Sequence, residues 1–170
     1  MSGRDEETAR FISDLADRQA ITEVLIRYCR AVDRLDVELL TSVYHLDAID
    51  DHGGWVGDAP TFVAQAKRFM TKHFEASQHR LSNISIELDG DIAYVESYVL
   101  ATHVLADNGI EVGGARYVDR FERRQSDWRI SHRTVVMDYY VTGDRGAPSA
   151  HLAAFTAGRR DRTDPAYGRG

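Results

Sequence analysis

The chain has 170 residues, which is the size of one domain with a substantial hydrophobic core. Hydrophobic residues make up 43% of the chain and charged residues 28%, which excludes collagen-like, low-complexity and wholly disordered proteins. The net charge of -6 repels phosphate backbones, so we expect no nucleic-acid partner.

Three helices are predicted in the first half of the chain. Asp17 is a candidate N-cap for an amphipathic helix that ends near Arg34, because apolar residues recur between them at steps of three and four. Two further helices are predicted over residues 37–44, with Asp36 as the cap, and over residues 61–74. Each of the three should bury one face.

The second half of the chain changes to a period of two, which is typical of strands. Turn residues such as Asp89-Gly90-Asp91 separate the alternating segments. We therefore predict a meander of four long strands, with a short edge strand earlier in the chain, over residues 81–88, 92–105, 113–124, 128–141 and 48–51.

This order of elements predicts an α+β domain over residues 1–142, in which a cone-shaped, curved antiparallel sheet wraps around the N-terminal helices. Residues 143–170 are rich in Gly, Ala, Arg and Asp and have the composition of a tail. We expect Leu152, Phe155 and Tyr167 to dock this tail on the body or on a neighbouring subunit.

Both faces of the predicted strand 92–105 carry apolar or aromatic side chains. One face would cover the helices, and a monomer would leave the other exposed to water. The sequence thus predicts a homo-oligomer, a dimer or a trimer, that forms through the outer face of the sheet.

Asp33 and His79 are the candidate catalytic residues. Asp33 falls in the last turn of the first helix, where the helix dipole makes a carboxylate unfavourable. His79 stands just before the first long strand, beside the apolar core. A carboxylate that accepts from one imidazole nitrogen leaves the other as a general base near neutral pH. The alternative is that Asp33 is a surface acid paired with Arg30 or Arg34.

Four segments of the sequence together resemble the SnoaL-like group of the NTF2-like superfamily, and the resemblance extends over about residues 15–142. It implies a cone-shaped α+β barrel with a deep apolar cavity between the helices and the curled sheet. The segments, whose order and spacing carry the resemblance, are Tyr28–Asp36, Gln78–Asn83, Gly114–Arg124 and Trp128–Arg133.

Scytalone dehydratase, hexachlorocyclohexane dehydrochlorinase and bile acid 7α-dehydratase belong to this group and use an Asp–His dyad, whose positions Asp33 and His79 match. The resemblance further implies that Tyr28, Tyr117 and Arg133 bind substrate. Tyr44 and His103 are the nearest equivalents of a further tyrosine and a second histidine in scytalone dehydratase. From its own position, His52 either faces the cavity or holds the Gly53-Gly54 turn.

The predicted function is that of a cofactor-independent lyase or isomerase acting on a small hydrophobic cyclic substrate. His79 would remove a proton, Asp33 would orient and charge-balance the ring, and Tyr28 with Tyr44 would donate hydrogen bonds to the developing oxyanion or the departing hydroxyl. One alternative is a non-catalytic ligand-binding module or accessory subunit. Another is polyketide cyclase or hydrolase chemistry in the same cavity.

We predict no metal site and no nucleotide cofactor. His45, Asp47, Asp50 and His52 are suitable ligand types, but only Asp50 and His52 would share one face of a strand. No Gly-rich phosphate loop precedes a helix. The single cysteine, Cys29, is expected to be a small buried filler.

The sequence also predicts where the protein resides. No apolar run approaches the roughly 20 residues that a membrane helix needs, so no membrane partner is expected. The charged N-terminus lacks the features of a secretory signal, and one cysteine cannot form an internal disulfide. We therefore expect a cytoplasmic protein.

Overall fold

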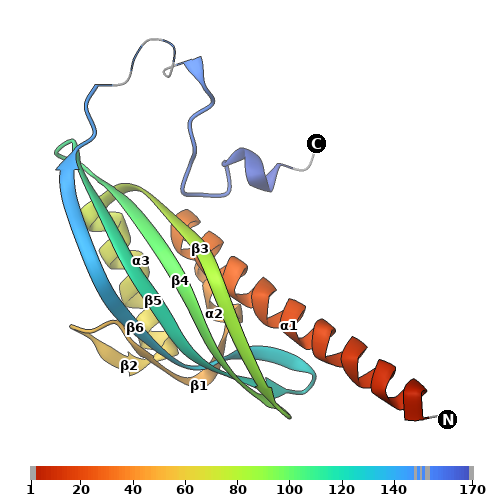
Figure 1. Cartoon of the computed structure of the whole chain (residues 1–170). Coiled ribbons are helices and arrows are strands. Elements are labelled where there is room, and N and C mark those ends of the chain that lie inside the picture. The colour runs from red at the N-terminus through yellow and green to blue at the C-terminus, as the bar shows by residue number, and fades with distance from the viewer. Residues whose placement is uncertain (1–2, 148, 150, 152–153, 169–170) are drawn as a thin grey trace.

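A computed structural model describes residues 3–147, 149, 151 and 154–168 (Figure 1). Within these residues a helical layer lies against one curved sheet, and a C-terminal segment follows the last strand. The elements in chain order are α1 (Gly3–Arg34), α2 (Val37–Ser42), β1 (Tyr44–Asp51), β2 (Val56–Asp58), α3 (Ala59–His73), β3 (Phe74–Asp89), β4 (Ile92–Leu105), β5 (Gly109–Arg124), β6 (Asp127–Asp144) and a 3₁₀ turn, η2 (Pro165–Tyr167).

The six strands form one sheet in the order β2-β1-β6-β5-β4-β3. The four long strands pair antiparallel as the predicted meander. The sheet is nevertheless mixed, since β1 runs parallel to β6. A parallel pair needs a long crossover connection, and the chain from β2 to β5 supplies it. The α+β class with a curved sheet is thus confirmed, and the predicted antiparallel pairing holds for every neighbouring pair of this sheet except β1 and β6.

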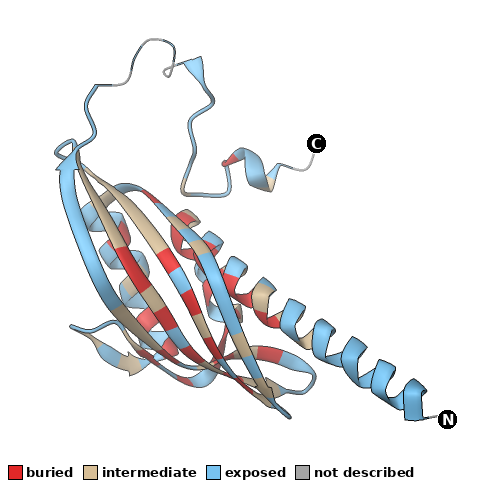
Figure 2. Cartoon of the chain, viewed as in Figure 1, coloured by how far each residue is buried: buried red, intermediate tan, exposed pale blue. Residues whose placement is uncertain are grey.

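Helix α1 begins at Gly3, so the prediction that Asp17 caps its N-terminus was wrong. Residues 3–16 continue the helix because they are rich in Ala, Glu, Arg and Leu, which favour it. This half of α1 is exposed along its length (Figure 2). Asp17 instead lies within the helix and accepts hydrogen bonds from Arg123 Nη1 and Trp128 Nε1, both at 2.8 Å.

Other predicted boundaries also shift. Helix α2 ends at Ser42, and Tyr44 begins β1, four residues before the predicted edge strand. Strand β3 begins at Phe74, so His79 lies well inside it and pairs in register with Ala101. The polar residues at the start of β3 obscure the alternation there.

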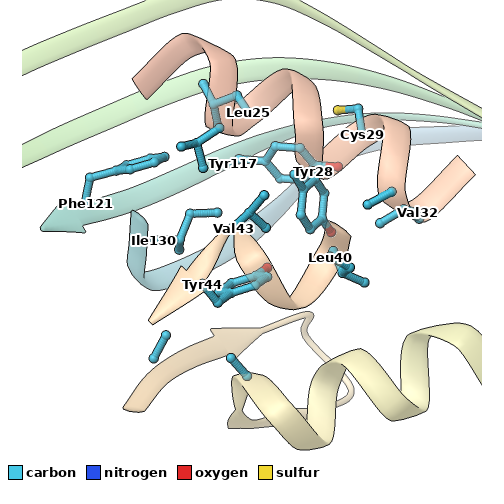
Figure 3. Packing of buried hydrophobic residues seen from close by; sticks show 14 of the residues in the cluster. Leu25, Tyr28, Cys29, Val32, Leu40, Val43, Tyr44, Tyr117, Phe121 and Ile130 are labelled. Atoms are coloured by element: carbon cyan, nitrogen blue, oxygen red, sulfur yellow. The ribbon is translucent and has the colours of Figure 1, made fainter. Parts of the chain in front are cut away.

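The strands curve around the helices (Figure 1), and the core lies between α1 and the concave face of the sheet. Figure 3 shows Leu25 and Tyr28 of α1 packed close to Tyr117 of β5. On β4, Ala93 and Val95 are buried in this layer.

The outer face of β4 carries Tyr94 and Tyr98, which are 51% and 43% exposed in the single chain. Assembly through this face stays a prediction. Among the described residues, none of the helices has the length and apolar content that a membrane span requires.

The predicted boundary between domain and tail falls inside β6, which continues to Asp144. Of the three residues expected to dock the tail, Tyr167 donates a hydrogen bond to Asp36 Oδ2 at 2.9 Å. Phe155 is 66% exposed and does not pack on the body of this chain, and Leu152 lies outside the described residues.

We expect Asp17→Ala to lower the free energy of unfolding by about 1–3 kcal/mol, because Arg123 and the Trp128 indole lose a shared acceptor. Asp14→Ala, on the exposed face of the same helix, should change it by less than about 0.5 kcal/mol. Urea denaturation of the two variants measures the difference. Equal effects would show that the Asp17 contacts do not stabilise the fold.

Candidate functional site

Asp33 and His79 are in direct contact across the junction of α1 and β3. Oδ1 of Asp33 lies 2.7 Å from Nδ1 of His79, and Oδ2 accepts the His79 backbone N–H at 2.9 Å. Because the carboxylate only accepts, Nδ1 carries a proton, and Nε2 of the neutral ring keeps its lone pair. The two side chains are 11% and 9% exposed, respectively, so water screens the contact poorly.

The local fold explains why this acid stands at an unfavourable helix position. A carboxylate in the last turn of α1 faces the negative end of the helix dipole. Both of its oxygens are satisfied by one residue of β3, which packs on α1. The contact therefore fixes His79 at two points, its backbone N–H and its imidazole ring.

His103, on the neighbouring strand β4, lies beside the dyad. Its ring is 5.5 Å from the His79 ring in an edge-on arrangement and stacks on Phe74 at 4.3 Å. Burial, followed by the electrostatic influence of the neighbouring His79, lowers the pKa of His103 to about 4. His103 is thus neutral at pH 7 and contributes a polar but uncharged wall.

A second histidine–carboxylate pair occupies β1. Asp50 is fully buried and accepts from the Tyr44 hydroxyl at 2.6 Å and from Nδ1 of His52. Nε2 of His52 then faces the Tyr28 hydroxyl at 3.4 Å. The His52 ring stacks on Phe62 at 4.7 Å. The His52 backbone N–H closes the Gly53-Gly54 turn by donating to the Trp55 carbonyl at 2.9 Å, and the Asp51 carboxylate also holds the turn by accepting from the Gly53 N–H at 2.8 Å.

Arg133 is the centre of the buried polar residues. Its Nε and Nη2 donate to the two oxygens of Asp119 at 2.7 and 2.6 Å. The guanidinium carbon lies over the rings of Tyr28 and Tyr117, at 4.1 and 4.0 Å from their centres. Burial raises the pKa of both tyrosines far above 10, so their hydroxyls stay protonated. Nη1 of Arg133 is buried without a partner among the described residues.

The structure thus divides the predicted site residues into two groups. Asp33 and His79 form one. The other residues contact one another, and no hydrogen bond or ring contact among the described residues joins them to the dyad. This second group consists of Tyr28, Tyr44, His52, Tyr117 and Arg133, with the unpredicted Asp50, Asp119 and Phe62.

Two hollows in the described part of the chain lie away from the dyad, and neither is the deep apolar cavity that the resemblance implies. One hollow of about 10 Å³ lies among α1, α2 and α3, where Val32, Leu40 and Met70 line it. An open depression of about 240 Å³ is lined by Arg27 and Trp128 among others. Asp33 and His79 line neither hollow. Large side chains such as Arg133 and Tyr28 are buried in the interior.

No group of three or more potential ligands is placed to hold a metal ion in the part of the chain that is described. His45 contacts the Glu122 carbonyl at 2.9 Å, and Asp47 pairs with Arg124 at 2.7 Å. These two side chains therefore diverge from Asp50 and His52. Burial of Cys29 raises its pKa to about 12, which keeps the thiol protonated and unreactive.

Comparisons with known proteins agree on the fold. The family model of the SnoaL-like domain matches residues 13–134. An uncharacterized protein of Mycobacterium tuberculosis is 30% identical over 127 residues, which are 72% of this chain and 86% of the relative. The crystal structure of LinA has a TM-score of 0.75 at 25% identity and covers 81% of this chain and 98% of its own.

A putative scytalone dehydratase from Novosphingobium aromaticivorans superposes with a TM-score of 0.71 over 86% of this chain and 99% of its own. Its 19% identity shows the fold alone. A hexachlorocyclohexane dehydrochlorinase, LinA type 2, gives a TM-score of 0.75 over 82% of this chain and 98% of its own. Its 23% identity likewise shows only that the fold is shared.

We expect Arg133→Met to lower the free energy of unfolding by about 3–5 kcal/mol, because the Asp119 carboxylate is then buried without a partner. The double variant Arg133→Met/Asp119→Leu removes both charges and should recover most of that loss. Urea denaturation compares the two. A double variant that is less stable than Arg133→Met would contradict this account.

The lowered pKa of His103 makes stability depend on pH. Below about pH 6.5 the unfolded chain protonates this ring, while the folded chain does so only near pH 4, so stability falls on acidification between these values. His103→Phe keeps a ring against Phe74 and should lose less stability between pH 7 and pH 5 than the wild type. Denaturation at both pH values measures this, with the exposed His132→Gln as the control.

Proposed function

Because this chain belongs to the SnoaL-like domain family, we propose that it is a cofactor-independent lyase or isomerase acting on a small hydrophobic cyclic substrate. The observation that carries the proposal is the two-point contact of Asp33 with the ring and backbone of His79. A general base must be held in one tautomer and one orientation, and this contact supplies both.

In the proposed reaction, Nε2 of His79 removes a proton beside an electron-withdrawing or leaving group. The Asp33 carboxylate stabilises the imidazolium that forms, as the acid of a catalytic triad does. In an elimination the leaving group departs with the electron pair, and in an isomerisation His79 returns the proton to another carbon. The names of the structural neighbours, a dehydrochlorinase and a putative dehydratase, also describe eliminations.

We assign proton transfer to the dyad alone. The hydroxyl of Tyr44 is committed to Asp50, and the hydroxyl of Tyr28 faces His52. The second group of site residues therefore supports the walls of the barrel, and its role in binding substrate stays a prediction.

A non-catalytic ligand-binding module is the second candidate. The hollows favour it, because neither of them contains the dyad. If the protein is such a module, ligands should bind to it without exchange of their carbon-bound protons.

We expect His79→Gln to lower turnover by about 10²–10⁴-fold, because the base is lost, and Asp33→Asn to lower it because the imidazolium loses its counter-charge. Turnover and solvent-deuterium incorporation are followed by NMR over a panel of cyclic hydroxyketones and chlorinated cyclohexanes. The exposed His132→Gln is the matched control and should retain wild-type rates.

Unchanged turnover in His79→Gln would refute the assignment of the base. Panel compounds that bind the wild type but neither react nor exchange deuterium would favour the ligand-binding module.

A further inference from the structure

The C-terminal segment 159–167 contacts the C-terminal end of α1, which carries Asp33, and the start of α2. The Arg34 guanidinium pairs with Asp164 at 3.6 Å, and the Tyr167 hydroxyl donates to Asp36, which lies between α1 and α2. Arg30 and Arg162 each stand 4.9 Å from the centre of the Tyr167 ring. These contacts are polar and pair partly exposed arginines with the nearly buried Asp36 and Asp164, and none of them belongs to the hydrophobic core, so the segment can release and dock again without unfolding the core.

From this segment Arg160 reaches the junction of α3 and β3. Its Nη1 donates to the backbone carbonyls of Met70 and Phe74 at 3.2 and 2.7 Å, which fixes the plane of the guanidinium. Its Nε and Nη2 are buried and have no acceptor among the described residues. One edge of a positively charged group is thus oriented and unpaired.

The unpaired edge has a specific geometry. The Nε–H and Nη2–H bonds of arginine are parallel and match the two oxygens of a carboxylate. The same chain shows this match at Arg133, whose Nε and Nη2 bind the two oxygens of Asp119 at 2.7 and 2.6 Å. Arg160 presents the same edge, although no carboxylate of the described chain occupies it.

Arg160 belongs to the surroundings of the dyad. Phe74, whose carbonyl it binds, stacks on His103, and His103 lies 5.5 Å from the His79 ring. The Asp33 carboxylate acts on the Arg160 guanidinium electrostatically and opposes the lowering of its pKa by burial. A ligand anion on Arg160 would therefore lie within the electrostatic surroundings of the dyad.

We propose that Arg160 is the anion-recognition residue of the Asp33–His79 site and that the substrate carries a carboxylate on its hydrophobic ring. This inference rests on the proposed function and deepens it by naming the substrate class. The segment opens to admit the substrate, and the carboxylate is held by Nε and Nη2 when the segment docks again. The substrate's carbon-bound proton is then presented to His79.

The test compares matched acids and amides as probes: benzoate with benzamide, and cyclohexanecarboxylate with its carboxamide. Calorimetric titration of the full chain should give the carboxylates at least about tenfold tighter binding than the amides. Arg160→Met should reduce this preference to about onefold. Arg160→Lys keeps the charge but not the two-pronged edge and should fall between them.

Arg162→Met is the matched control, because Arg162 also holds the segment through Asp36 and Glu38 but is 65% exposed at its side chain. It should keep the preference for carboxylates. If Arg162→Met and Arg160→Met lose the preference equally, Arg160 only fastens the segment and the proposal fails. The proposal also fails if the wild type binds acids and amides equally or binds neither.

His79→Gln separates this inference from the proposed function. Retained carboxylate preference in His79→Gln, with turnover lost, supports both. Retained turnover in His79→Gln refutes the proposed base, while the acid–amide comparison still decides the role of Arg160.

Discussion

One carboxylate joins the helical layer to the sheet at the proposed site. Asp33 stands where the dipole of α1 disfavours it, and its two oxygens take up both N–H groups that His79 offers. The position of the imidazole relative to α1 follows from this contact, and so does the nitrogen that remains free to accept a proton. The proposals for the reaction and for Arg160 depend on that geometry.

The interior of the barrel is polar to a degree that its overall composition does not suggest. Arg133, Asp119 and Asp50 are almost completely buried, and each has specific hydrogen-bond partners, although Nη1 of Arg133 has none among the described residues. Such groups are costly to bury unless the hydrogen-bonding geometry is good, so they specify one packing arrangement of the strands around Tyr28.

The sequence was sufficient to predict the fold class, the four-strand meander and the family. The sequence also identified Asp33 as a candidate, because an acid in the last turn of a helix is unfavourable there, and His79, because it lies beside the apolar core. Asp50 was placed on one strand face with His52, and the two are in contact, but its bond to Tyr44 was missed. Asp119 was missed altogether, because a carboxylate on an alternating strand looks the same whether it meets solvent or a buried partner. Arg160 was missed because its position depends on a segment that is far from the dyad in sequence and lacks periodicity. The N-terminal half of α1 was missed because it is helical by residue propensity and buries no apolar face within the chain.

That first half of α1 has a consequence for dynamics. A helix of 32 residues with a rise of about 1.5 Å per residue extends about 48 Å, and its N-terminal turns project beyond the sheet (Figure 2). Phe11, Ile12 and Leu15 on these turns are largely exposed and add no tertiary support within the chain. A helical segment as short as the exposed residues 3–16 is marginally stable in water without packing. Amide hydrogen exchange in the single chain should therefore slow progressively from Gly3 toward the buried turns around Ile21.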